Sequence, residues 1–368
     1  MPADALLASL ATLEPLLAAE MPAGRRQCRL PQTVVDALVE RGAFRLWVPR
    51  RYGGLELPLP EALRIYEAVA RLDGAAGWAV MIGAGGGLFA AYLDPEAAAR
   101  LFSPRNAVVA GSGAPTGTAE RVAGGYQASG RWRYASGAHY ASIFTANCRV
   151  VERGEPVLVE GAPLIRAMSF RPADVDIVET WDTTGLRATG SHDIVVRSAF
   201  VPASDTFSVF TDAPREPGPL YRLPFGTLTE LPVSAVVLGI ARHALAEFES
   251  LARAKPSPFG GGRLVSHTRV AQAILAARLS IDAVAMRLSV LAELAWTSAL
   301  ACDPIDATVI ADCTTGCAMG VARLVEAIGA LVTLAGMNAV HREDPFSIAW
   351  QDLAAAAAHY SVSPLAAD

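Results

Sequence analysis

The chain has 368 residues, of which 52% are hydrophobic and 18% charged, enough for a large core shared by two or three packed regions. A formal net charge of −5 and a pI near 5.8 argue against a surface that binds nucleic acid or anionic membranes. The cysteines show no disulfide-like or metal-ligand spacing, so we expect free thiols and no metal site. They are Cys28, Cys148, Cys302, Cys313 and Cys317.

The N-terminus, residues 1–18, is rich in Ala and Leu but carries Asp4 and Glu14 and lacks a basic start. This pattern predicts an amphipathic helix and not a signal peptide. The Ala-rich stretches elsewhere are interrupted by Arg, Asp and Glu, so we expect no bilayer-spanning segment. The sequence therefore predicts a soluble cytoplasmic protein.

The first region, residues 1–104, has helical periodicity. Helices are predicted to begin near Pro31 and Pro60, the first ending at Gly42. A third, Ala75–Leu93, is apolar on most faces, which is typical of a helix buried on all sides.

The second region, residues 105–204, changes to short alternating runs separated by Gly, Pro and Asp. Gly124-Gly125 marks a hairpin between two of these runs. No helical stretch lies between the strands, so we expect a small β-barrel or sandwich and not a doubly wound sheet. The predicted strands are Ala107–Gly111, Tyr126–Tyr134, Ile143–Val150, Pro156–Glu160 and Ile194–Phe200.

The third region, residues 205–368, returns to long helical patterns with short connections. The four predicted helices are Glu230–Arg253, Val265–Thr297, Asp303–Ala335 and Ser347–His359. Their lengths suit an antiparallel four-helix bundle, so the fold class is α+β and mostly α. Stretches such as Ala327–Gly336 hold more small and apolar residues than one bundle core needs, which predicts a homotetramer built as a dimer of dimers.

This order of helical region, β region and bundle is that of the acyl-CoA dehydrogenase fold, and several motifs resemble that superfamily. Gly124–Gly137 and Trp181–Asp193 are the most specific, and both resemble the flavin-dependent hydroxylase branch, which includes hydroxyphenylacetate hydroxylases and dibenzothiophene monooxygenase. Further similar stretches are Leu46–Leu55, Asp73–Trp78 and Gln351–His359.

The resemblance implies the oxygenase partner of a two-component system. A flavin reductase would supply reduced FMN, or less favourably FAD, and O2 would be used to oxygenate a small aromatic or nitrogenous substrate. The pocket would lie between Ala75–Leu93, the β region and the bundle, where Gly83–Gly87 would leave room for a bulky ring.

Two candidate catalytic residues follow from the same resemblance. His359 matches a histidine that lies over the flavin in this branch, where an imidazole titrating near neutrality can donate or accept a proton. Ser136 matches a hydroxyl near flavin N5. The alternatives are an exposed histidine at a helix end and a serine that only satisfies its own turn.

Candidate cofactor contacts are Ser112, Ser136, Gly137 and Trp181. By resemblance, Ser112 occupies a loop facing the pyrimidine edge of the flavin, and the Trp181 ring could pack on the isoalloxazine, although an aromatic at the edge of the β region is an alternative. His139 and His192, beside the same motifs, are interpreted as structural.

Some positions depart from the family pattern. Pro256 stands where dehydrogenases carry an Arg that contacts FAD of a neighbouring subunit, which favours FMN, and Gln351 replaces an expected Arg. The terminal segment 352–368 has no Glu to remove an α-proton. Glu247 or Glu249 could still serve a dehydrogenase with a displaced base, and a third possibility is a member that keeps the fold without flavin.

Overall fold

The computed structural model describes residues 2–258, 260, 262–301 and 304–367, so Cys302 lies outside the described residues. The N-terminal helices are α1 (Ala3–Ala11), α2 (Glu14–Gln27), α3 (Gln32–Glu40), α4 (Leu59–Leu72), α5 (Gly74–Gly85) and α6 (Pro95–Phe102). The amphipathic helix predicted over residues 1–18 is in fact two helices, α1 and α2, bent by 63°. The cysteines Cys28, Cys148, Cys313 and Cys317 are free thiols.

Helix α5 continues as a 3-10 turn, η3 (Gly86–Ala91), and is buried on most faces as predicted. Its glycines do not leave the room expected of Gly83–Gly87. A Cβ at Gly83 would collide with Phe44, one at Gly86 with Val109, and one at Gly87 with Val48. These glycines let neighbouring elements approach closely. Among Gly83, Gly85, Gly86 and Gly87, only Gly85 has open space beside it, so the room expected for a bulky ring is present at that position alone.

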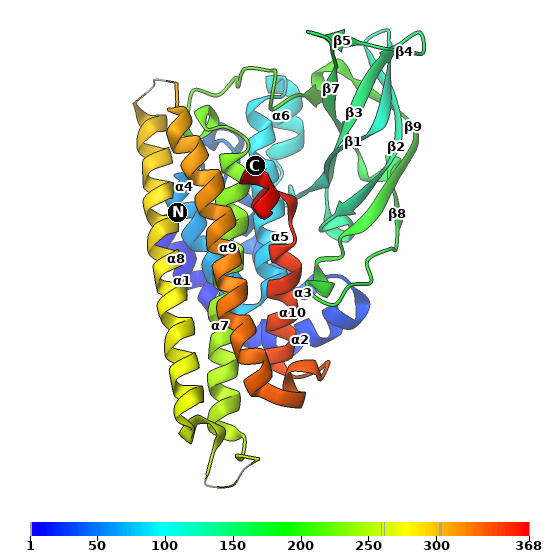
Figure 1. Cartoon of the computed structure of the whole chain (residues 1–368). Coiled ribbons are helices and arrows are strands. Elements are labelled where there is room, and N and C mark those ends of the chain that lie inside the picture. The colour runs from blue at the N-terminus through cyan, green and yellow to red at the C-terminus, as the bar shows by residue number, and fades with distance from the viewer. Residues whose placement is uncertain (1, 259, 261, 302–303, 368) are drawn as a thin grey trace.

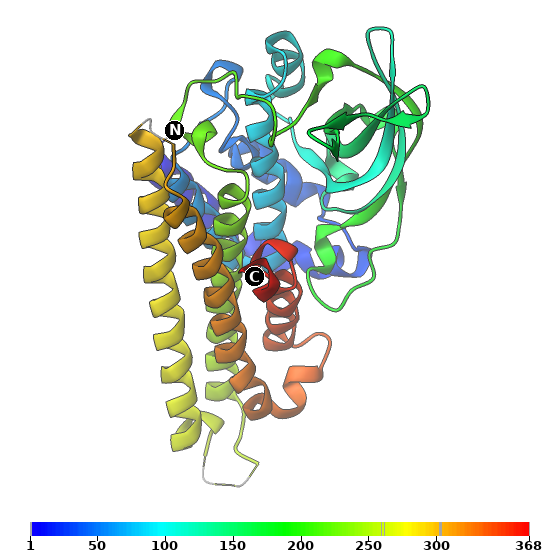
Figure 2. The same cartoon turned by 45° about the horizontal axis from the view of Figure 1, so that its top comes forward.

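The central region is a mixed sheet with strand order β10-β7-β3-β1-β2-β9-β8, and β4 pairs with β3. Its strands are β1 (Val109–Val122), β2 (Gly125–Ala135), β3 (Ile143–Glu152), β4 (Glu155–Pro156), β7 (Ile165–Phe170), β8 (Asp176–Val178), β9 (His192–Pro202) and β10 (Thr206–Phe207). A separate two-stranded ribbon joins β5 (Leu158–Val159) and β6 (Ala162–Pro163). The sheet curls around its own core of small and aromatic side chains, among them Trp132 and Phe170 (Figure 2).

A small β-barrel or sandwich was predicted here, and the described residues form a curled mixed sheet that does not close. Within the described residues, the terminal strands β10 and β8 do not pair with each other. Closure requires tilted strands whose register returns to the first strand, and these end strands have only two and three residues. The parallel pairing of β1 with β3 was also not anticipated.

The C-terminal helices are α7 (Thr227–Ala254), α8 (Thr268–Leu300), α9 (Ala307–Ala335) and α10 (Pro345–Ala357), close to the four predicted. In Figure 1 these long helices lie side by side, with α5 between them and the sheet. His359 lies two residues past the end of α10. The segment that follows it folds back against α7 and α9 (Figures 1 and 2). The His359 imidazole itself contacts Trp78 of α5, which in turn contacts Ser136 beside the end of β2.

Three helical stretches are long and apolar enough to cross a membrane, contrary to the expectation from sequence. Gly74–Ala91 is 83% buried and Thr227–Ala254 is 78% buried within the protein, so their hydropathy is explained by the core. Ala307–Val340 is only 39% buried in a single copy of the chain.

Candidate functional site

The loop that carries the second motif is fixed on α10 by one buried carboxylate. Asp352 Oδ1 accepts a hydrogen bond from the backbone N–H of Leu186 at 2.6 Å, and Leu186 holds a left-handed φ of 50°. Gly185 lies against the backbone of Gln351 so closely that a Cβ would collide with its carbonyl. The bend at 185–186 therefore sets the position of the loop relative to the bundle.

The environment of Asp352 disfavours its charge. Burial, and then the nearby carboxylate of Asp73, raise the pKa of Asp352 to about 7, while the Leu186 N–H and Arg25 oppose this. Arg25 pairs with Asp73 at 3.2 Å, and Asp73 also caps the first turn of α5. One short polar network thus connects α2, α5, α10 and the loop.

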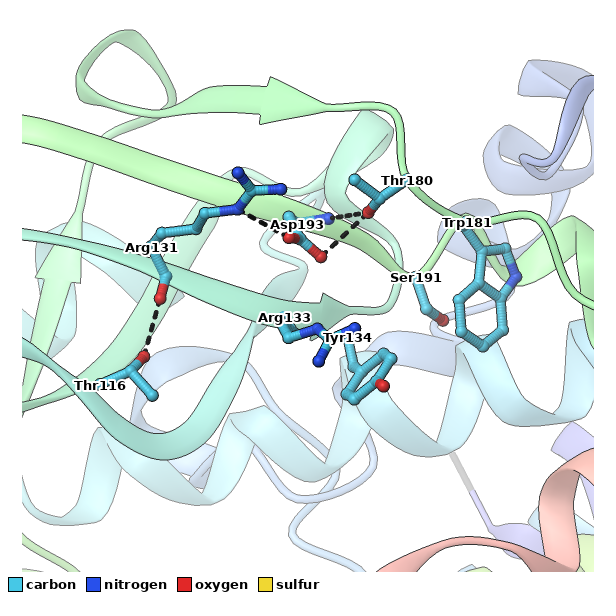
Figure 3. Close-up of a pocket in the computed structure, with 8 residues that line it drawn as sticks. All are labelled: Thr116, Arg131, Arg133, Tyr134, Thr180, Trp181, Ser191 and Asp193. Carbon is cyan, nitrogen blue, oxygen red and sulfur yellow. Dashed lines mark hydrogen bonds and ion pairs between the residues drawn. The ribbon is translucent and has the colours of Figure 1, made fainter.

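Beside this loop lies an open pocket of about 400 Å³ on the sheet. Figure 3 shows its lining residues, which are Thr116, Arg131, Arg133, Tyr134, Thr180, Trp181, Ser191 and Asp193. The rings of Tyr134 and Trp181 meet edge to face with centroids 6.2 Å apart, and the Tyr134 ring is 60% exposed. The pocket therefore has an accessible aromatic wall.

Charges line the rest of the pocket. Arg131 pairs with Asp193 at 2.8 Å, and Asp193 also accepts a hydrogen bond from Thr180 (Figure 3). The guanidinium of Arg133 lies over the Tyr134 ring, 5.2 Å from its centroid, and forms no ion pair with any described residue. Arg133 is thus a cation available to a ligand anion.

A chain of hydroxyl groups leads from the pocket into the protein. Ser191 Oγ lies 2.6 Å from Ser136 Oγ and 2.7 Å from Thr189 Oγ1. On its far side, Ser136 accepts a hydrogen bond of 3.1 Å from the indole N–H of Trp78 on α5. Ser136 and Ser191 are 6% and 4% exposed, so these hydroxyl contacts are shielded from bulk water.

His359 reaches the other side of Trp78. The two rings meet edge to face with centroids 5.5 Å apart, and the Tyr360 ring lies 4.7 Å from the imidazole centroid. The Nδ1 atom is hydrogen-bonded within its own turn to Ser361 at 2.8 Å. Burial lowers the pKa of His359 to about 4, so the ring is neutral near pH 7.

The structure thus brings Ser136, Trp181 and His359 to one region. The other two predicted residues, Gly137 and Ser112, do not line the pocket. Gly137 adopts φ 82° and donates its backbone N–H to the carbonyl of Thr189, so it shapes the turn. Ser112 is not among the pocket-lining residues. It precedes a register shift in β1, and Thr116 within that shift lines the pocket instead.

Several residues of the site were missed from sequence. Tyr134 and Ser191 stand inside the two motifs and could have been singled out. Trp78 ends a third motif, but nothing local shows that its indole N–H meets a serine 58 positions away. Arg133 resembles any exposed strand arginine, and Asp352 acts through a partner 166 positions away.

One of the two glutamates considered as a displaced dehydrogenase base is held in ion pairs. Glu249 accepts hydrogen bonds from two arginines, Arg278 and Arg253. Within the described residues, no group of three or more His, Cys, Asp or Glu side chains could hold a metal ion.

The residues of the pocket fit a flavin. Such a cofactor combines a flat ring system, polar ring edges and a phosphate tail. The Tyr134 and Trp181 rings supply flat apolar contact, Ser191 and Ser136 supply hydroxyls, and Arg133 supplies an unpaired cation.

Comparison with known proteins agrees with this chemistry. Residues 11–101 match the model of the acyl-CoA dehydrogenase N-terminal domain, and residues 231–364 match that of its C-terminal domain. The chain is 32% identical over 326 residues to indole-3-acetate monooxygenase of Pseudomonas putida, covering 88% of this chain and 81% of that protein. The chain belongs to the acyl-CoA dehydrogenase family, in its flavin-dependent monooxygenase branch.

Two further comparisons support this membership. The oxygenase subunit HsaA of a flavin-dependent monooxygenase from Mycobacterium tuberculosis is 28% identical, covering 98% of this chain and 93% of that subunit. The structure of XiaF from Streptomyces, solved with FADH2 and glycerol, matches with a TM-score of 0.90 at 24% identity, covering 98% and 92% of the two chains. The predicted family, fold and type of enzyme are therefore confirmed, and the protein is the oxygenase component of a flavin-dependent monooxygenase.

Proposed function

We propose that the pocket beside Tyr134 and Trp181 holds reduced flavin, with Ser136 and His359 acting on the oxygenation reaction. The observation that carries the proposal is the chain of contacts from Ser191 in the pocket through Ser136 to Trp78 and His359. When bound, reduced flavin supplies the electrons that activate O2 for transfer of one oxygen atom to the substrate.

The residues of the chain have separate roles in this proposal. The Ser136 hydroxyl accepts a hydrogen bond from Trp78 and donates one to Ser191, because the Ser191 hydroxyl donates to Thr189 and Thr189 donates to the Leu186 carbonyl. Ser136 would therefore act on the cofactor through Ser191, which lines the pocket. Nδ1 of the neutral His359 imidazole accepts a hydrogen bond from the Ser361 N–H, so its Nε2–H can donate a hydrogen bond to the substrate or the cofactor. Trp78 orients both groups, and burial of the cluster keeps bulk water out.

We propose FMN in preference to FAD as the cofactor. Pro256 removes the arginine expected to contact the FAD diphosphate, which favours FMN. The neighbouring Lys255 does not replace it, since its ammonium is bound to the Ala335 carbonyl and the Asn338 side chain, both at 2.7 Å. Phe259, the other residue of that motif, lies outside the described residues. The XiaF structure shows that this fold also accepts FADH2. We expect FMN to bind at least as tightly as FAD.

The proposed substrate is a small aromatic or nitrogenous molecule. Along α5 and η3, the partly exposed residues Ile82, Gly85 and Phe89 follow Trp78 at helical spacing, and Gly85 faces open space. Phe89 packs against Phe207 with ring centroids 4.8 Å apart. This face offers a planar, apolar surface next to the neutral imidazole, and indole-3-acetate in the name of the P. putida relative belongs to the same chemical class.

A flavin reductase is the proposed partner, because an oxygenase component receives its reduced flavin from a second protein. We also propose a soluble cytoplasmic homotetramer. Helix α8 exposes a stripe of large apolar side chains, which are Leu275, Leu279, Met286, Val290 and Leu294. They recur at the spacing of one helical face, which is typical of a helix that packs on another copy.

The proposal is tested by anaerobic titration of chemically reduced FMN and FAD, followed by addition of O2 with a panel of phenols and indoles. Tight binding of reduced FMN and an oxygenated product are expected. Selective, tight binding of oxidised FAD that is bleached by an acyl-CoA would instead support a dehydrogenase, and no binding of either reduced flavin would indicate a member without cofactor.

A further inference from the structure

His192 lies at the centre of the pocket wall although its ring does not line the pocket. It is 3% exposed, pairs with Ala135 between β2 and β9, and stands between the pocket residues Ser191 and Asp193. The residue opposite it in the sheet is therefore the immediate neighbour of Ser136.

The imidazole holds the opposite wall through one nitrogen atom. Its Nδ1 accepts hydrogen bonds from two successive backbone N–H groups, those of Thr180 and Trp181, at 3.1 Å each. A ring nitrogen that accepts in this way carries no proton, so the ring is the neutral tautomer with its hydrogen on Nε2. Nε2 is buried and has no hydrogen-bond partner within the described part of the chain.

We propose that His192 is a positioning residue that orients the Thr180–Trp181 wall for reduced flavin, because its Nδ1 accepts both hydrogen bonds that hold this wall. Without this acceptor, the backbone N–H groups of Thr180 and Trp181 would lose their partner. Trp181 would then be held mainly by its indole N–H bond to the Leu186 carbonyl at 3.0 Å.

One other imidazole packs against the ring. The ring of His139 meets His192 edge to face at 5.1 Å between centroids, and Glu179 lies 3.8 Å from His139 Nε2. Asp193, next in the chain, is already paired with Arg131. His139 is therefore a suitable residue for a control variant beside His192.

The proposal rests on the proposed flavin site, so its test includes a measurement without cofactor. Amide hydrogen exchange of the segment around Thr180 and Trp181 is measured in the flavin-free protein, and reduced FMN affinity is measured in parallel at the same pH. The variants are His192→Asn, whose amide oxygen can accept without titrating, His192→Leu, which cannot accept, and His139→Asn as the matched control.

In the wild type, we expect the two amides to be protected and reduced FMN to bind. His192→Asn should keep protection and affinity within about threefold, and His192→Leu should lose the protection and bind FMN about tenfold or more weakly. His139→Asn should match the wild type. If His192→Leu does not fold, His192→Ala takes its place. Unchanged protection and affinity in His192→Leu, or loss of both in His139→Asn alone, would overturn the proposal. Failure of the wild type to bind reduced flavin would refute the flavin site, while amide exchange would still test the role of His192.

Discussion

Trp78 donates its indole N–H to the hydroxyl of Ser136 at 3.1 Å, and the opposite side of the same indole packs on His359. One side chain of α5 thereby fixes the distance between the sheet and the segment after α10. This relationship explains why the two residues proposed for catalysis, 223 positions apart in the chain (359 − 136), act in one place.

Replacing Trp78 by Phe tests this linkage. The ring contact with His359 is kept, but Ser136 loses its donor, a change of about 1 kcal/mol or roughly fivefold. We expect reduced flavin to bind normally and product to fall about fivefold relative to hydrogen peroxide formed. The measurement is the ratio of product to peroxide per flavin oxidised. An unchanged ratio would show that the indole N–H only completes the packing.

His359→Ala should remove oxygenation while leaving the fold and flavin binding intact, because the imidazole acts after binding. Loss of a positioned acid or base lowers rates by about 10²–10⁴-fold. Ser136→Ala should increase peroxide release at the expense of product. Single-turnover product yields check both variants. If His359→Ala matches the wild type, the histidine is only a structural residue of its turn.

The pH dependence of turnover offers a separate check on His359. Its pKa of about 4 in the folded protein lies below the usual value of 6.5, so the ring stays neutral from about pH 5 upward. We expect no loss of rate from protonation of His359 between about pH 5 and pH 8. The stability contributed by its neutral form is lost as the pH falls from 6.5 toward 4.

Asp352→Asn should stabilise the protein at alkaline pH. The pKa of Asp352 is raised from 3.8 to about 7, so folding favours the protonated acid, and stability is lost as the pH rises from 3.8 through 7. The asparagine keeps an acceptor for the Leu186 N–H and carries no charge. We expect a higher melting temperature than wild type at pH 8 and little difference near pH 4, measured by thermal unfolding. The control variant Asp352→Ala should be less stable than the wild type at both pH values.

The proposed assembly is tested on the exposed stripe of α8. Met286, 72% exposed in a single copy, is replaced by Arg. If the stripe packs on another copy, burying this charge is costly and the tetramer should dissociate, as measured by light scattering. Phe200→Glu, at a residue 51% exposed on the sheet, is the matched control and should leave the mass unchanged. A wild-type monomer at micromolar concentration would contradict the proposal directly.

The sequence predicted the elements whose periodicity is long and regular, such as α7 and α9, and the family through two motifs. It did not predict how the sheet ends, because strand order and closure depend on pairing between distant segments such as β1 and β3. The same limit applies to the site. Ser136 and Trp181 were found from motifs, whereas the contacts of Trp78 and Asp352 span 58 and 166 positions and have no local signal.

A single turnover with reduced FMN under oxygen-18 gas, comparing wild type with Ser136→Ala and His359→Ala, tests whether the protein oxygenates a substrate through these residues. We expect an aromatic or nitrogenous product carrying one labelled oxygen atom in the wild type, and mainly labelled hydrogen peroxide in the two variants. Labelled peroxide as the sole fate of O2 in the wild type with every substrate of the panel, together with bleaching of bound FAD by an acyl-CoA, would contradict this expectation.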